Sequence, residues 1–145
     1  MNRLTTLSFL FIGLALSVSA QSGGIAGKLT YPSDYIPPEM IICVSNGGET
    51  YCSNQSRSRL SAAKISFRLN HRAANYEVRL PAGSYFIYGT FPRGKAPTPD
   101  MEGLKAYYND FVKCGMDIKC NSKKPISIKV AAGRIIRSIT VGDWY

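Results

Sequence analysis

Apolar and polar residues alternate along much of this chain, which indicates short strands with one buried face. Within residues 64–70, Ile65, Phe67 and Leu69 alternate with lysine, serine, arginine and asparagine. A period of two is the pattern of a half-buried strand. The same pattern, or a run rich in aromatic and β-branched residues, predicts further strands at 24–31, 40–45, 49–53, 76–80, 84–91, 126–130 and 134–141.

Turn residues separate these segments at regular intervals. Asn46-Gly47-Gly48 is typical of a tight hairpin, and Pro81-Ala82-Gly83 and Ala131-Ala132-Gly133 punctuate the later strands. Residues 54–63 are polar and small and predict a loop. Seven or eight short strands joined in this way predict an all-β fold, an antiparallel sandwich of seven to eight strands.

One segment departs from the period of two. Its apolar residues are spaced i, i+3, i+4 and i+7, as on one face of a helix, and they are Leu104, Tyr107, Tyr108 and Phe111. The sequence therefore predicts a single short amphipathic helix near residues 101–113.

The N-terminus has the pattern of a cleavable export signal. Arg3 precedes an apolar run over residues 7–18, and Val18-Ser19-Ala20 supplies small residues ahead of a cut. The run is too short for a stable bilayer anchor, and no cysteine follows the cut to carry a lipid. We therefore expect a signal peptide at 1–20 and one domain at 21–145. The protein would be periplasmic or secreted, without a membrane span or a lipid anchor.

Four cysteines lie behind this signal, and an oxidising compartment favours two disulfides. If Gly47 and Gly48 form a two-residue hairpin loop, residues equidistant from that loop face each other, so Cys43 lies opposite Cys52. Alternation outward from the loop makes this a non-hydrogen-bonded pair, with α-carbons about 4.5 Å apart. That separation is within the range of a disulfide. The register therefore predicts a Cys43–Cys52 bridge.

The second pair, Cys114 and Cys120, is close enough in sequence for a local bridge after the predicted helix. The pairings 43–114 with 52–120 and 43–120 with 52–114 stay open at this point. A four-cysteine zinc site is the rival hypothesis, but the Cys-x2-Cys spacing of zinc knuckles is missing and the compartment oxidises thiols. We therefore predict no metal site.

Several segments carry a resemblance to a known family. They are residues 76–85 with the Pro-Ala-Gly turn, 130–133, 31–38, 105–108, and the terminal Asp143-Trp144-Tyr145. The chain resembles small exported bacterial proteins with a carboxypeptidase regulatory-like, transthyretin-like (prealbumin-type) domain. The resemblance implies a seven-stranded sandwich, transthyretin-like or Ig-like in type. It implies folding or interaction as the role, because the group has no common activity.

Candidate catalytic residues are few. His71 is the only histidine, and because it lies in a polar stretch without positioned acids we expect it to be a solvated loop residue. Hydroxyisourate hydrolases, which resemble transthyretin, need several histidines and a Tyr-Arg-Gly-Ser terminus, and this chain has neither. We predict no catalytic residues, no enzyme activity and no cofactor.

The chain is strongly basic. It has 18 lysines and arginines against nine acids, for a formal net charge of +9. Such a balance favours anionic partners, and it also keeps a protein soluble without any partner. Lys64, Arg68 and Lys129 project from the outer faces of their predicted strands, and a cationic face results if these strands share a sheet. The predicted contact residues are Arg57, Arg59, Lys64, Arg68, Arg72, Lys123, Lys124 and Lys129.

These observations predict a non-catalytic binding domain. Its partner would be an anionic envelope polymer or an acidic protein, contacted through the basic residues. Nucleic acid is disfavoured because no recognition module is present. The alternative is an inhibitor or immunity-type protein that neutralises an enzyme through an exposed loop with Tyr31, Tyr35 and Ile36. The sequence leaves the oligomeric state open.

Overall fold

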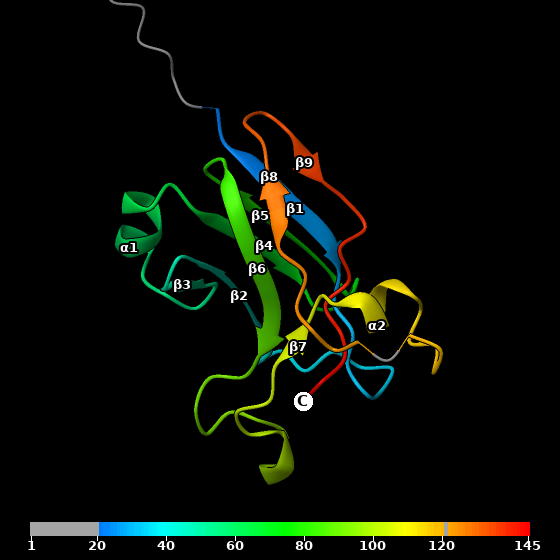
Figure 1. Cartoon of the computed structure of the whole chain (residues 1–145). Helices are drawn as coiled ribbons and strands as arrows, with labels where there is room; N and C mark the ends of the chain where they lie inside the picture. The colour runs from blue at the N-terminus through cyan, green and yellow to red at the C-terminus, as the bar shows by residue number, and fades with distance from the viewer. Residues whose placement is uncertain (1–20, 121) are drawn as a thin grey trace, which may run out of the picture.

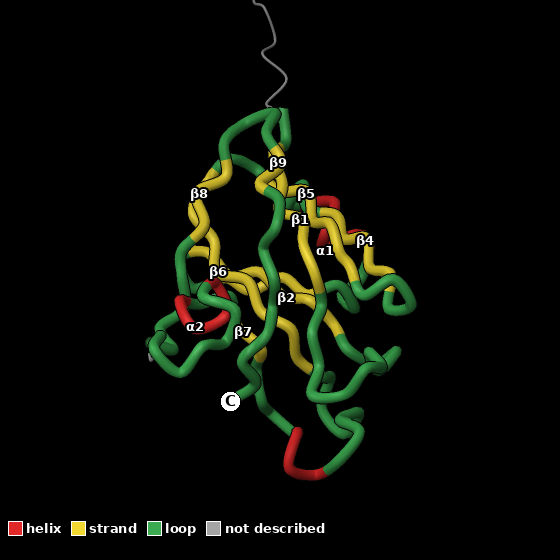
Figure 2. The backbone as a smooth tube through the Cα atoms, turned by 90° about the vertical axis from the view of Figure 1, so that its right-hand side faces the viewer, coloured by secondary structure: helices red, strands yellow, loops and turns green. Residues whose placement is uncertain are grey.

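The computed structural model describes residues 21–120 and 122–145, which form mostly β-structure in two sheets (Figure 1). The predicted signal peptide at 1–20 lies outside the described residues. Figure 2 shows the sheets as two layers, and side chains from both layers form one hydrophobic core between them. The prediction of a mainly β fold with two sheets is therefore confirmed.

The four-stranded sheet has the order β4-β5-β1-β9. Its strands are β1 (Gly23–Lys28), β4 (Ser66–Asn70), β5 (Asn75–Leu80) and β9 (Ile135–Ile136). β1 pairs antiparallel with β5 but parallel with β9. The expectation of purely antiparallel pairing was wrong here, because the chain reaches β9 by crossing from the other sheet rather than through a hairpin.

The second sheet has the order β3-β2-β6-β7, and β8 also pairs with β6. Its strands are β2 (Ile41–Asn46), β3 (Glu49–Cys52), β6 (Gly83–Thr90), β7 (Ala106–Tyr107) and β8 (Ile128–Val130). All its pairings are antiparallel. Over the described residues the structure has nine strands, two of them only two residues long, where the sequence predicted seven or eight.

Alternation decides which side chains enter the core. In β5, Tyr76, Val78 and Leu80 are buried, while Glu77 and Arg79 point outward, as the sequence pattern predicted. Burial of one large aliphatic side chain contributes about 1.5–3 kcal/mol, so each correctly placed strand stabilises the sandwich substantially.

Beyond β9 the C-terminal segment continues alongside β1, with Ile139 and Val141 buried and Arg137 and Ser138 exposed, and Figure 2 shows it running down toward the C-terminus. The Ile139 amide donates to the Ala26 carbonyl at 3.2 Å. The Tyr76 hydroxyl donates to the Ile139 carbonyl at 2.7 Å, and burial raises the pKa of Tyr76, so that the phenol stays protonated. A Cβ on residue 27 would overlap the same Ile139 carbonyl group, so this position requires glycine.

The predicted helix near 101–113 was wrong over most of its length. A 3-10 turn forms at Pro99–Met101, β7 follows, and only α2 (Asp110–Lys113) is helical. Residues 104–108 instead follow a period of two: Ala106 is buried, and Leu104 and Tyr108 pack against the core, which suits an edge strand on β6. Asn109 then caps α2 by accepting a hydrogen bond from the Val112 amide at 2.9 Å.

The predicted loop at 54–63 contains a second short helix, α1 (Arg57–Ala62). Ser56 caps it by accepting from the Arg59 amide at 3.4 Å, and Leu60 packs against the core. The signal for this helix was the serine at its start, since six residues are too few to show a helical period. Within residues 21–120 and 122–145, neither helix has the length and apolar character needed to cross a bilayer.

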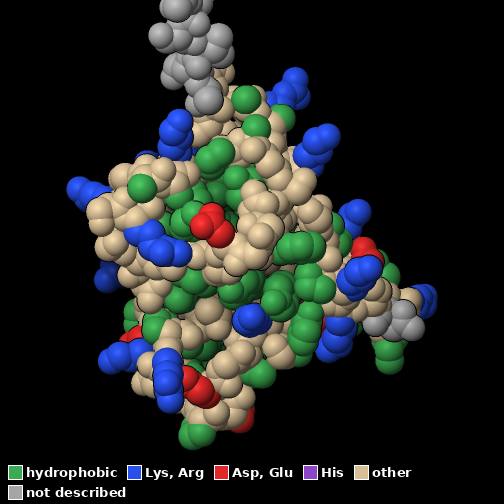
Figure 3. Space-filling view, turned by 60° about the vertical axis from the view of Figure 1, so that its left-hand side comes forward, with side chains coloured by type: hydrophobic (Ala, Val, Ile, Leu, Met, Phe, Trp, Pro, Cys, Tyr) green, Lys and Arg blue, Asp and Glu red, His purple; other side chains and the backbone are tan. Residues whose placement is uncertain are grey.

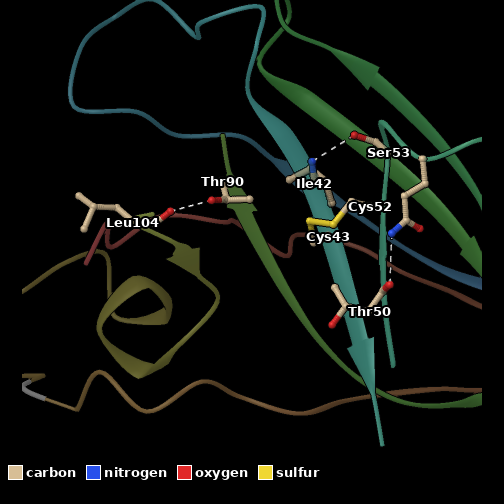
Figure 4. Close-up of a disulfide and its surroundings, with 8 residues drawn as sticks. Ile42, Cys43, Thr50, Cys52, Ser53, Thr90 and Leu104 are labelled. Carbon is tan, nitrogen blue, oxygen red and sulfur yellow. Dashed lines mark hydrogen bonds between the residues drawn. A yellow bond between two sulfur atoms is a disulfide. The ribbon is translucent and has the colours of Figure 1, made fainter. Parts of the chain in front are cut away.

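The hairpin of β2 and β3 has the register predicted from its glycine turn. Cys43 faces Cys52, their α-carbons are 4.0 Å apart, and a disulfide joins them (Figure 4). The adjacent pair is hydrogen-bonded, with the Ser53 amide donating to the Ile42 carbonyl at 2.9 Å. The second disulfide joins Cys114 to Cys120, so the crossed pairings that the sequence left open are not formed.

We expect removal of the first disulfide to destabilise the protein more than removal of the second. Each bridge closes a short loop, which is worth about 2–3 kcal/mol in the chain-entropy description. Cys43 is also buried whereas Cys114 is exposed, so truncation at Cys43 leaves a cavity as well. Urea unfolding of Cys43→Ala/Cys52→Ala beside Cys114→Ala/Cys120→Ala measures the difference. Equal losses would contradict the role given to burial.

Candidate functional site

A hollow of about 1340 Å³ lies along the four-stranded sheet. Residues of β1, β4 and β5 line it, together with the segment 34–38, the β4–β5 turn and residues 137–138. We call it the basic hollow and define it by Lys28, Arg68, Arg72 and Arg137, which are its lysine and arginine side chains.

Sheet register brings these cations together. Arg68 on β4 is paired with Glu77 on β5, and Glu77 is paired with Ala26 on β1, so the three side chains form one row across the outer face. In the next row Asn75 is paired with Lys28. Because Ala26 is small, the β1 end of the row leaves space beside the larger charged side chain of Glu77.

The other two cations come from connections. Arg72 lies in the β4–β5 turn, where the Asn70 side chain accepts a hydrogen bond from the Ala73 amide at 3.0 Å. Arg137 directly follows β9, whose Ile136 pairs with Ile25 of β1. The β4–β5 turn and the residue after β9 therefore add two arginines to Lys28 and Arg68 of the sheet.

The hollow has an excess of positive charge. Its acids are Asp34 and Glu77, and Glu77 forms an ion pair with Arg79 at 2.8 Å. The other ion pair among the described residues is Lys123–Asp143, so the four cations have no acidic partner in that part of the chain. Guanidinium groups bind carboxylates and phosphates through paired hydrogen bonds. The arrangement is thus suited to holding anionic groups.

His71 is anchored rather than freely solvated, which corrects the expectation from sequence. Its Nε2 lies 2.8 Å from the Met40 carbonyl oxygen, and the ring is half-buried at the wall of the hollow. Since a carbonyl only accepts, Nε2 carries the proton of this hydrogen bond. Among residues 21–120 and 122–145, no three histidine, cysteine or carboxylate side chains gather so as to hold a metal ion.

The eight predicted basic residues do not form one face. Arg68 and Arg72 line the hollow, while Arg57 and Arg59 lie on α1 and Lys64 follows it. Lys123 and Lys124 precede β8, and Lys129 lies on β8 itself. The predicted common face was wrong because β4 and β8 belong to different sheets.

Lys28 and Arg137 were missed as candidates. A signal for Lys28 was present in the sequence, since Gly24, Ala26 and Lys28 alternate with the buried Ile25 and so share the outer face of the first strand. Arg137 had no comparable signal, because its position depends on the parallel pairing of β9 with β1.

Two of the three predicted loop contacts, Tyr31 and Ile36, pack inward, although most of the loop 31–38 is exposed. Tyr31 packs edge-on against Phe91 and Trp144, with ring centroids 6.0 and 5.6 Å away. Ile36 is only 7% exposed and belongs to the core, whereas Tyr35 is 66% exposed and lines the hollow. Tyr35 is therefore the one of the three positioned to meet a partner.

Comparison with known proteins gives no neighbour from which a role could be carried over: no protein-family model, curated protein or solved structure matches this chain.

Proposed function

We propose that this protein is an exported, non-catalytic binding domain that contacts an anionic envelope polymer or an acidic protein through the basic hollow. The proposal rests on four cations that form no ion pair within the described residues and gather in one concave surface. Two disulfides support an oxidising, exported location, because such bonds persist outside the reducing cytosol.

The size of the hollow favours an extended ligand. Pockets for small molecules are typically about 300–1,000 Å³, and the basic hollow is larger, at about 1340 Å³. A polymer or the surface of an acidic protein would span the distance from Arg68 on β4 to Arg137 after β9, with Tyr35 as an exposed contact at the wall.

We also propose that the chain belongs to the carboxypeptidase regulatory-like, transthyretin-like group. The support is a shared arrangement of its two most specific segments. The Pro81-Ala82-Gly83 turn leads from β5 in one sheet to β6 in the other, and the Ala131-Ala132-Gly133 turn leads back from β8 to β9. Both turns therefore connect the layers of the sandwich.

The proposed contact predicts binding that depends on salt. The oxidised protein is titrated against lipopolysaccharide and against a polyglutamate chain, at about 0.05 M and about 0.5 M salt. Because exposed charge pairs are screened at high ionic strength, we expect the affinity for at least one of them to fall about tenfold or more. An affinity that is the same at both salt concentrations would overturn the electrostatic contact.

A further inference from the structure

A row of aromatic side chains lies on the outer face of the five-stranded sheet, which is the face turned away from the core. Tyr88 on β6 is paired with Tyr107 on β7, with ring centroids 5.1 Å apart, and Tyr107 lies 5.7 Å from Tyr145. Phe86 is two residues before Tyr88 on β6 and shares its face. We call Phe86, Tyr88, Tyr107 and Tyr145 the aromatic strip.

The strip is partly open to solvent and rigidly held. Phe86 is 40% exposed and Tyr145 is 42% exposed. The backbones of Lys105 and Tyr145 exchange two hydrogen bonds, at 3.0 and 3.3 Å, and these fix the last ring beside β7. At the other side, Cys43 of the first disulfide is paired with Tyr88. The rings are therefore preorganised, which lowers the entropy cost of binding.

Lysine side chains lie over rings of the strip and beside it. Lys105 Nζ lies 4.9 Å from the centre of the Tyr88 ring, and Lys123 Nζ lies 5.5 Å from that of Tyr145. Lys129 on β8 is paired with Ser84 and so lies on the same face, near Phe86. On this side of the molecule, Figure 3 shows a broad area of hydrophobic side chains with lysine and arginine side chains within it and around it, and fewer acidic ones.

The carboxylate beside Lys123 does not cancel this charge at the surface. Asp143 is 9% exposed and accepts a hydrogen bond from the buried amide of Asn109 at 2.6 Å. Its ion pair with Lys123, at 3.2 Å, leaves the lysine side chain 57% exposed. The strip is thus an apolar surface of tilted rings, with Lys105 over the Tyr88 ring and the exposed side chain of Lys123 beside Tyr145.

Not every phenol hydroxyl of the strip is used within the protein, although Tyr88 is only 8% exposed and Tyr107 is half-buried. Among the described tyrosines, the hydroxyls of Tyr51, Tyr76, Tyr85 and Tyr145 donate within the protein. Those of Tyr88 and Tyr107, at the centre of the strip, make no such bond within the described residues. A matching ligand would have flat apolar faces for the rings, hydroxyl groups for the phenols and negative charge for the lysines.

We propose that the aromatic strip binds an acidic saccharide chain. The C–H face of a pyranose packs on an exposed ring such as Phe86, its hydroxyls reach the phenol of the half-buried Tyr107, and its carboxylates meet Lys105, Lys123 and Lys129. A second copy of this chain is disfavoured as occupant, because a symmetric contact would bring like charges together. The inference does not rest on the basic hollow, which lies on the other sheet.

The test is calorimetric titration of the full oxidised protein with a short oligogalacturonate, and with its methyl-esterified, neutral form as the uncharged counterpart. We expect the acidic form to bind more tightly. Phe86→Ala and Tyr107→Ala should each weaken its binding about tenfold or more, as loss of a central aromatic contact typically does. Ile118→Ala is the matched control, because Ile118 is an apolar side chain that is 92% exposed in the Cys114–Cys120 loop.

If Tyr107→Ala is too unstable to be measured, Phe86→Ala still tests the proposal, because the Phe86 ring lies outside the core and its loss should leave the fold intact. Unchanged affinity in Phe86→Ala would overturn the proposal, and so would no binding of oligogalacturonate by the native protein. Equal competition by a polyglutamate chain would assign the strip to an acidic protein instead. Loss of saccharide binding in Arg68→Glu/Arg137→Glu, with the strip variants unaffected, would place the saccharide in the basic hollow.

Discussion

Replacing Gly27 with alanine is expected to cost about 3 kcal/mol or more of unfolding free energy, a large effect for one methyl group. The new Cβ would overlap the carbonyl group of Ile139, which is backbone and is held from two sides. The Ile139 amide donates to Ala26 and the Tyr76 hydroxyl donates to the Ile139 carbonyl. Relief of the overlap therefore requires that the C-terminal segment leave β1.

The measurement is urea unfolding followed by circular dichroism, with Gly94→Ala as control. Gly94 has φ +70° and open space around a Cβ, so alanine there carries only the cost of the left-handed conformation, about 1 kcal/mol. If Gly27→Ala unfolds at the same urea concentration as Gly94→Ala, the segment 138–141 does not pack against β1 as described.

The strands of the sandwich were predictable where their position and register depend only on residues close in sequence. The period of two in β4 and β5 and the hairpin register around Gly47 and Gly48 depend on neighbouring residues alone. The helix expected near 101–113 failed for the opposite reason. Its apolar residues fit both a helix and an edge strand, and pairing of Tyr107 with Tyr88 on the distant β6 decided between them.

The candidate site was predictable only in part, for the same physical reason. The alternation of apolar and polar residues correctly predicted that Arg68 faces outward. The same pattern does not show which sheet a strand joins. Lys129 therefore lies beside the aromatic strip rather than beside Arg68. The hollow also needs Arg137, which is placed by a parallel pair formed across more than a hundred residues of chain.

The largest expected effect on binding comes from reversing two charges of the basic hollow. Arg68→Glu/Arg137→Glu replaces guanidinium groups on both sides of Ala26 with carboxylates. Such a change removes two ion pairs and adds repulsion, so the affinity for an acidic ligand should fall about a hundredfold at low salt. Both positions are exposed, and the fold should tolerate the change.

The matched control is Arg57→Glu/Arg93→Glu, which changes the net charge equally at two exposed arginines on α1 and in the loop after β6. The decisive measurement compares the affinities of the two double variants for the acidic ligand that the native protein binds. We expect the affinity of the hollow variant to fall about a hundredfold and that of the control less than about threefold. Equal losses in both variants would mean that net charge alone drives binding, and would contradict a binding site in the hollow.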